Sequence, residues 1–216
     1  MTRRPLLRSL LLFALLPFAA IAAAPQPALV EGTDYEVIEG GIPFAPLKGK
    51  VEVVEVFGYT CPHCAHFQPV VSAWAKKNAK TVNFIPMAAP FGGSWQPYAQ
   101  AYYAAQVLGL ADKTHDAMFK ALHTDGTLPM RNATSGEIAP FYARYGVDPA
   151  KFQATYDSAE VAARVTKAEQ FIRRSGVEGT PTLVINGRYR VVGHDFNDVL
   201  RIADQLIARE RDGKTR

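Results

Sequence analysis

The sequence predicts an α/β fold that carries an inserted all-helical domain. Three observations predict it: a valine-rich run leads into a helical pattern, a long strand-free segment follows, and a hairpin signal precedes a closing amphipathic helix. With 48% apolar and 20% charged residues, the 216-residue chain has the composition of a globular protein rather than a disordered one. The expected parts are a leader at 1–23, a first core part at 24–90, a helical insertion at 91–162 and a second core part at 163–216.

The N-terminal segment is typical of a cleaved export signal. Arg3, Arg4 and Arg8 form a basic start, an apolar stretch covers 10–18, and small residues follow, so we expect cleavage near 22–24. The apolar stretch is too short to predict a membrane span, and the paired arginines loosely resemble a twin-arginine leader. Without these three arginines, 21 basic residues face 20 acidic ones. That balance gives no reason to expect nucleic acid or an anionic membrane as a partner.

The first core part is predicted from two strand signals and one helix. A short edge strand is expected at 35–38, and the run at 51–57 is apolar enough for a central strand covered on both faces. A helix with one apolar stripe follows, with Pro62 in its first turn and Pro69 expected to kink it. A second buried strand is expected at 82–86.

The insertion is predicted from helical periodicity without a strand signal. Its expected helices cover 96–108, 113–123, 135–145 and 148–158. A further helix at 161–175, capped by Gly176, is expected to join the insertion to the core. The insertion holds several large aromatics, namely Trp95, Tyr98, Tyr102, Tyr103 and Phe119. Their helical spacing favours core positions over a substrate groove, so we assign them no site role.

The second core part is predicted to be a hairpin and a helix. Segments 182–185 and 189–192 flank an Asn-Gly dipeptide, which is a strong signal for a tight antiparallel turn. Asp195 is placed to cap the closing helix. Pro181 enters the first strand of the hairpin, a position that often marks a special turn, sometimes with a cis peptide bond.

The only two cysteines, Cys61 and Cys64, are the strongest functional signal. A bridge across so short a loop removes little entropy from the unfolded chain, which argues against a purely structural disulfide. The strand, turn and helix place Cys61 at the positive end of the helix, where free N–H groups and the dipole favour a thiolate. We therefore expect Cys61 to be the nucleophile. Cys64, more buried and with a higher pKa, would resolve the mixed disulfide.

Two neighbouring residues are candidates for tuning this chemistry. His63, if cationic or donating a hydrogen bond, would further stabilise the Cys61 thiolate. A thiolate favoured by about two pKa units makes the disulfide about 60 mV more oxidising, which favours a disulfide donor. For Glu55 two interpretations stay open. It is a buried carboxyl with a raised pKa that shuttles a proton for Cys64, or it marks, together with Glu52, a partly exposed strand face.

A metal site is the main alternative from another class of protein. The nominal ligands are Cys61, Cys64, His63, His66 and His194. Adjacent His63 and Cys64 cannot easily bind one ion together, and no second Cys-x-x-Cys exists, so we predict no metal. Taken singly, His66, His115, His123 and His194 fit surface positions or hydrogen-bonded core positions.

Over most of its length the chain resembles the DsbA family of periplasmic thiol:disulfide oxidoreductases. The resemblance is carried by the Cys61-Pro62-His63-Cys64 motif after the valine-rich strand, the helical insertion, and segment 176–182 before the hairpin. It implies a thioredoxin-like fold. By this resemblance, Cys61 corresponds to the exposed attacking cysteine and Cys64 to the buried resolving one, while Pro62 and His63 tune the potential.

The resemblance also assigns residues outside the motif. Pro181 corresponds to the cis-proline, and the backbone of Thr180 to the contact with extended substrates. Glu55 corresponds to the buried acidic position, and Pro69 to the helix-kinking proline.

The function implied is that of a protein dithiol oxidase. It would donate its disulfide to newly exported, cysteine-containing proteins in the periplasm, need no metal or organic cofactor, and be reoxidised by a quinone-linked membrane partner of the DsbB type. The chain offers no separate dimerisation domain of the kind found in the periplasmic isomerases, so we expect a monomer. The alternatives are a reductase or isomerase on the same fold, and a metal-binding Cys-x-x-Cys protein.

Overall fold

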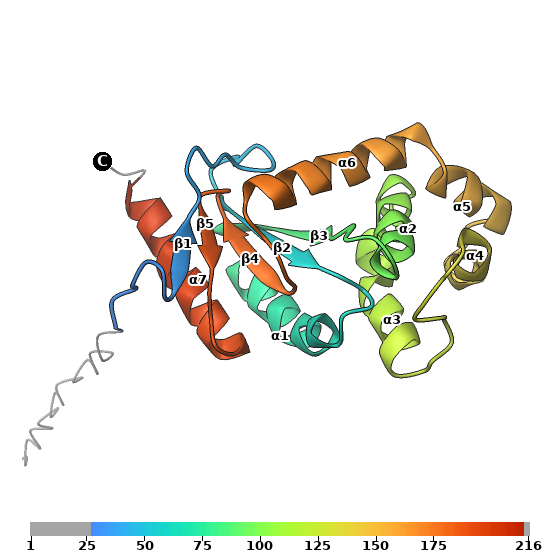
Figure 1. Cartoon of the computed structure of the whole chain (residues 1–216), viewed down its shortest axis with the longest axis horizontal. Coiled ribbons are helices and arrows are strands. Elements are labelled where there is room, and N and C mark those ends of the chain that lie inside the picture. The colour runs from blue at the N-terminus through green and yellow to red at the C-terminus, as the bar shows by residue number, and fades with distance from the viewer. Residues whose placement is uncertain (1–26, 214–216) are drawn as a thin grey trace, which may run out of the picture.

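The computed structural model describes residues 27–213, and the expected leader at 1–23 lies outside them. One mixed sheet forms the centre, with the strand order β1-β5-β4-β2-β3. Its strands are β1 (Tyr35–Val37), β2 (Val51–Phe57), β3 (Val82–Ala88), β4 (Thr182–Ile185) and β5 (Tyr189–Val191). Strands β2 and β3 are parallel and the other neighbouring pairs are antiparallel. The sheet and its helices confirm the predicted α/β class (Figure 1).

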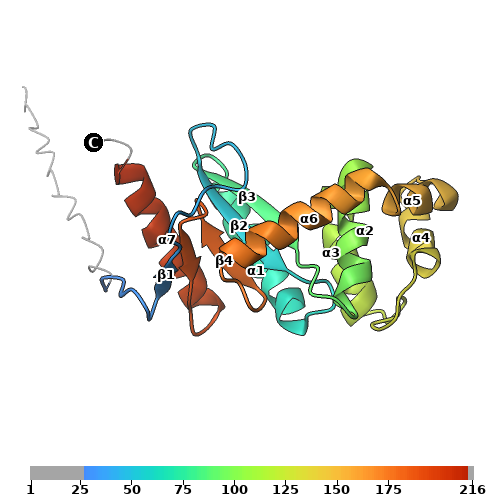
Figure 2. The same cartoon turned by 45° about the horizontal axis from the view of Figure 1, so that its top comes forward.

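Seven helices lie within residues 27–213. They are α1 (Pro62–Asn78), α2 (Trp95–Val107), α3 (Ala111–His123), α4 (Ser135–Ala143), α5 (Pro149–Tyr156), α6 (Ala159–Arg174) and α7 (Phe196–Gly213). Helices α2 to α5 gather at one end of the molecule, and the long α6 runs back from them along the sheet (Figures 1 and 2). The predicted helices between β3 and β4 are thereby confirmed. We keep 91–162 as the proposed limits of the insertion.

The central strand β2 is buried along its whole length, because helices cover both of its faces. Side chains alternate along a strand, so Val53 packs with α1 and α7, whereas Val54 and Val56 pack with α6 and the insertion. The prediction of a central strand covered on both faces is confirmed. One consequence is that a polar side chain anywhere in β2 is removed from water.

Two turns contain residues with a positive φ, which glycine and asparagine adopt more readily than other residues. Asn186 and Gly187 both have positive φ, 49° and 65°, as the tight turn between β4 and β5 requires. Gly176, with φ 61°, ends α6 as predicted, and its N–H bonds back to Arg173.

No helix within residues 27–213 combines the length and the apolarity that a crossing of the bilayer requires.

Candidate active site

The turn between β2 and α1 delivers Cys61 to the start of the helix. The N–H of Cys61 donates to the carbonyl of Gly58 at 3.1 Å, which closes a turn with Tyr59 and Thr60 at its centre. Cys61 is the N-cap of α1, and its sulfur accepts the N–H of Cys64 at 3.4 Å. Pro62 at the first helical position has no N–H that would need a partner. The sulfur of Cys61 therefore takes the place that a capping oxygen takes in other helices.

The two thiols lie in different surroundings. Cys61 has 7% of its surface exposed and Cys64 has none, and the sulfur of Cys64 accepts the N–H of Gly58 at 3.5 Å. The resemblance implied an exposed attacking cysteine. In the reduced structure Cys61 is instead only marginally accessible, because the loop at Thr180 lies against it.

The same contacts separate the acidities of the two thiols. A hydrogen bond with the Cys64 thiol, supported by the backbone N–H groups of Cys64 and His63, lowers the pKa of Cys61 to about 5. The bond to Cys61 and burial raise the pKa of Cys64 far above the ordinary value of a thiol. At neutral pH the reduced site thus holds a thiolate at Cys61 and a thiol at Cys64.

The loop before β4 meets this sulfur from the far end of the sequence. The peptide bond between Thr180 and Pro181 is cis. The carbonyl oxygen of Thr180 lies 3.5 Å from the sulfur of Cys61, within reach of a thiol proton. Pro181 borders a shallow cavity of about 270 Å³ next to β4 and β5. The structure thus brings together Cys61, Thr180 and Pro181, which are separated by about 120 positions in the chain.

Glu55 is buried, with 1% of its surface exposed, and neither carboxyl oxygen has a hydrogen-bond partner among the described residues. Burial raises its pKa to about 8. Glu52 is fully buried as well. The interpretation of a partly exposed strand face is therefore wrong, because helices cover both sides of β2. In the alternation along β2, Glu55 shares the face of Val53, which is the face covered by α1.

The side chain of His63 is exposed, and within residues 27–213 no hydrogen bond to its imidazole is formed. Its contribution in this structure comes through its backbone N–H, which helps to stabilise the Cys61 thiolate.

Sequence reasoning missed the residues that hold the turn in place. Tyr59, at the centre of the turn, bonds to His115 and to His123, both on α3 of the insertion. The two histidines were expected, one by one, to be ordinary surface or core residues. Their spacing with Phe119 at i, i+4 and i+8 marks a single helix face, and it was the signal available in the sequence.

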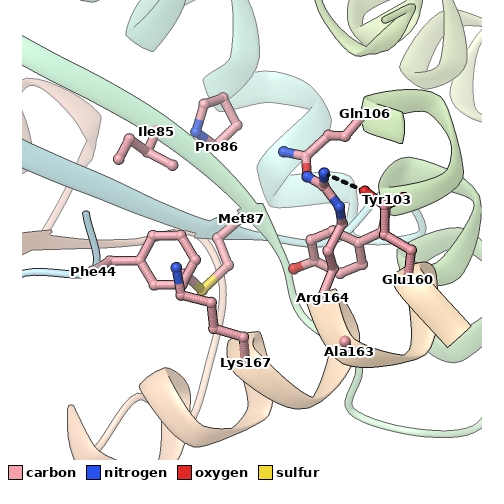
Figure 3. A pocket seen from close by; sticks show the side chains of 10 residues that line it. All are labelled: Phe44, Ile85, Pro86, Met87, Tyr103, Gln106, Glu160, Ala163, Arg164 and Lys167. Atoms are coloured by element: carbon pink, nitrogen blue, oxygen red, sulfur yellow. Dashed lines mark hydrogen bonds and ion pairs between the residues drawn. The ribbon is translucent and has the colours of Figure 1, made fainter. Parts of the chain in front are cut away.

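Across residues 27–213 no group of three or more His, Cys, Asp or Glu side chains is arranged to hold a metal ion. Cavities lie both next to the dithiol motif and away from it. A cavity of about 600 Å³ between α1 and α3 is lined by Pro62 of the motif and, among others, by His66, Phe119 and His123. A cavity of about 500 Å³ opens between β3, α2 and α6 (Figure 3). It is lined by Phe44, Ile85, Pro86, Met87, Tyr103, Gln106, Glu160, Ala163, Arg164 and Lys167. It shares no lining residue with the dithiol site.

Several known proteins that resemble this chain share the name DsbA. A model of the DSBA-like thioredoxin domain matches residues 52–203. The thiol:disulfide interchange protein DsbA of Pseudomonas aeruginosa is 35% identical over 210 residues, which cover 95% of this chain and 98% of that protein. DsbA of Bordetella parapertussis is 36% identical, over 91% of this chain and 96% of that protein. The crystal structure of the oxidoreductase DsbA from Xylella fastidiosa matches with a TM-score of 0.83 and 53% identity, covering 85% of this chain and 98% of the other.

Proposed function

The chain belongs to the family of DSBA-like thioredoxin domains and is a thiol:disulfide oxidoreductase, and we propose that it works as an oxidase, donating the Cys61–Cys64 disulfide to substrate proteins. The observation that supports this direction is the lowered pKa of Cys61, about 5, which comes first from the hydrogen bond with the Cys64 thiol and to a smaller extent from the N–H groups at the start of α1. A stabilised thiolate lowers the energy of the reduced form, so the disulfide tends to accept electrons. DsbA is a strong oxidant for the same reason, because its reduced form is stabilised.

The proposed reaction moves two electrons from substrate to enzyme. A substrate thiolate attacks the sulfur of Cys61, the bond between Cys61 and Cys64 breaks, and Cys64 leaves and takes up a proton. A second substrate thiolate then attacks the substrate sulfur of the mixed disulfide. This forms the substrate disulfide and releases Cys61 as a thiolate, the form its surroundings favour.

Glu55 is the proposed proton shuttle for Cys64. Its pKa of about 8 keeps the carboxyl mostly protonated at neutral pH, and no residue within 27–213 forms a hydrogen bond with it. It lies on the face of the sheet that α1 covers, as Cys64 does. His63 is proposed to tune the potential together with Pro62.

Thr180 and Pro181 are proposed to bind substrate. The carbonyl of Thr180 already lies against the sulfur of Cys61, so a backbone contact there would hold the residues next to the substrate cysteine. Consistent with the family, we place the protein in the periplasm as a monomer. Its substrates there are newly exported proteins with cysteines, and a quinone-linked membrane protein of the DsbB type restores the disulfide.

A redox titration against glutathione tests this function. We expect a potential more oxidising than about −180 mV, the range of protein disulfide isomerase. A potential near about −270 mV, as in reducing thioredoxins, would instead assign the protein to the reductases.

Replacing Cys64 with serine tests the order of attack. The variant Cys64→Ser should accumulate mixed disulfides between Cys61 and exported proteins, because Cys64 can no longer attack the sulfur of Cys61 and release the bound protein. Non-reducing electrophoresis of a periplasmic extract detects them, with Cys61→Ser as the matched control. Adducts in the Cys61→Ser variant, and none in Cys64→Ser, would reverse the assigned roles.

A further inference from the structure

We propose that helix α3 of the insertion positions the redox centre by holding Tyr59, and that His115 and His123 are the positioning residues. This inference rests on the proposed function and deepens it, because it gives the helical insertion a part in setting the thiol chemistry. The argument depends on which atoms of the active-site turn the insertion contacts.

Tyr59 is the residue through which the turn is held. It lies at the centre of the turn that the bond from Cys61 to Gly58 closes, two residues before the attacking sulfur. Only 2% of its surface is exposed. Its ring packs against Phe57 of β2 and against Phe119 of α3, with centroid distances of 5.1 Å and 5.0 Å. A movement of α3 would therefore be transmitted to the turn.

Two histidines of α3 bond to opposite ends of this tyrosine. Nδ1 of His115 lies 2.8 Å from the hydroxyl oxygen of Tyr59, and Nε2 of His123 donates to the carbonyl oxygen of Tyr59 at 2.7 Å. Both the side chain and the main chain of the turn are thus fixed to one helix. The two histidines and Phe119 form one continuous face of α3.

The hydrogen bonds also show which ring nitrogen of His115 carries the proton. Nε2 of Gln68 donates to Asp116 and to Ser72, both at 2.9 Å, so the amide oxygen of Gln68 is the acceptor for Nε2 of His115 at 3.1 Å. His115 therefore carries its proton on Nε2, and its Nδ1 accepts the proton of the Tyr59 hydroxyl. Burial lowers the pKa of His115 to about 4, which keeps the ring neutral.

The network contacts the chain on both sides of the dithiol motif. Tyr59 precedes Cys61, and Gln68 lies on α1 one turn beyond Cys64. A third contact comes from α2, because the ring of Trp95 packs so closely on Gly58 that a Cβ there would lie 1.8 Å from it. The insertion thus fixes the chain before the first cysteine and the helix after the second.

This arrangement bears directly on the thiolate. The sulfur of Cys61 receives the N–H of Cys64 only while the turn and the first turn of α1 keep their relative orientation. Loss of a bond to Tyr59 frees the turn and weakens that donation. The pKa of Cys61 should then rise and the disulfide become less oxidising.

The experiment compares two substitutions of His123 with two readouts, thiolate absorbance near 240 nm and equilibrium with glutathione. The variant His123→Leu removes the donor, and we expect the glutathione equilibrium to shift about threefold to tenfold towards the disulfide, as about half to one pKa unit implies. The variant His123→Gln keeps an N–H donor and should restore most of the wild-type value. Tyr59→Phe, which removes only the hydroxyl, should shift both readouts in the same direction.

The control is Thr114→Val on the same helix. The Thr114 hydroxyl is buried and donates to the carbonyl of Leu110, the N-cap of α3, so this isosteric change removes a buried hydrogen bond without touching Tyr59. It should lower the melting temperature and leave both readouts unchanged. Unchanged readouts in folded His123→Leu and Tyr59→Phe would overturn the inference, as would an equal shift in Thr114→Val. A reducing potential in the wild type would instead overturn the proposed function, so the two failures are distinguishable.

Discussion

The two ends of β2 treat buried polar groups in opposite ways. At the first end, the Glu52 carboxylate accepts the N–H groups of Phe44 and Ala45, both at 2.7 Å. The N–H of Glu52 donates to the side chain of Asn186, which in turn donates to Glu210. Each of these side chains is buried and each is bonded.

At the other end, next to the dithiol, some buried polar atoms lack partners although Tyr59 and His115 are bonded there. Both carboxyl oxygens of Glu55 and the hydroxyl of Thr60 are buried without a hydrogen bond among the described residues. This comparison shows which buried polar groups stabilise the fold and which destabilise it. Satisfied groups hold the sheet together, whereas the unsatisfied carboxyl of Glu55 costs free energy and leaves its proton available for chemistry.

The largest expected effect comes from replacing Glu55 with glutamine, which cannot ionise. In the folded protein the pKa of Glu55 is about 8, above the ordinary value of 4.5. The folded protein is therefore most stable below pH 4.5, where Glu55 is protonated in both states, and this stability is lost as the pH rises through 8. We expect the unfolding free energy of the wild type to fall by about 3.5 kcal/mol relative to Glu55→Gln between pH 5 and pH 8. Denaturant unfolding of the disulfide form isolates the effect, because its cysteines do not titrate. Parallel pH profiles for the two proteins would contradict it.

The second effect is at the end of β2 where the buried polar side chains are hydrogen-bonded. Asn186→Ala should lower the unfolding free energy by about 3 kcal/mol, because it strips partners from Glu52 and Glu210 and places alanine at a φ of 49°. The redox potential should stay unchanged. Asn186→Gly, which tolerates the backbone angle, separates the two causes and should recover part of the loss. A changed potential would show that the two ends are coupled.

The third effect concerns His63 and changes the potential more than the stability. Replacing it with glycine should make the couple less oxidising, by about 30 mV, the equivalent of one pKa unit at Cys61. Glutathione equilibration measures it. An unchanged potential would limit His63 to the backbone N–H that the structure shows.

The smallest effect is at Thr60. Thr60→Val removes an unsatisfied hydroxyl with little change in shape, so it should raise the unfolding free energy by up to about 1 kcal/mol. Calorimetry would detect it as a higher melting temperature. A lower melting temperature would show that the hydroxyl has a partner in solution.

Much of the fold follows from local patterns in the sequence. The valine-rich strand, the Asn-Gly turn and Gly176 each act through neighbouring residues, so periodicity and turn chemistry predicted them. The position of Cys61 at the start of α1 also follows from neighbouring residues. The approach of Thr180 to its sulfur was supplied by the family resemblance, because spacing alone gave only a weak signal.

The parts that escaped prediction depend on distant contacts. The burial of Glu52 and Glu55 was undecided because a glutamate pair looks alike on an exposed face and in a covered strand. The bonds from His115 and His123 to Tyr59 join residues 56 and 64 positions apart. A single histidine carries no sign of such a partner, and only the placement of α3 against the turn reveals it.

The measurement that tests the central claim most directly is the titration of the Cys61 thiolate by absorbance near 240 nm, with Cys61→Ser as the blank. The hydrogen bond with the Cys64 thiol, together with the N–H groups at the start of α1, predicts half-ionisation of Cys61 near pH 5, and Cys64 should not ionise below pH 9. Half-ionisation near pH 8.5, the value of an ordinary cysteine, would contradict it, and the proposed oxidising role would lose its physical cause.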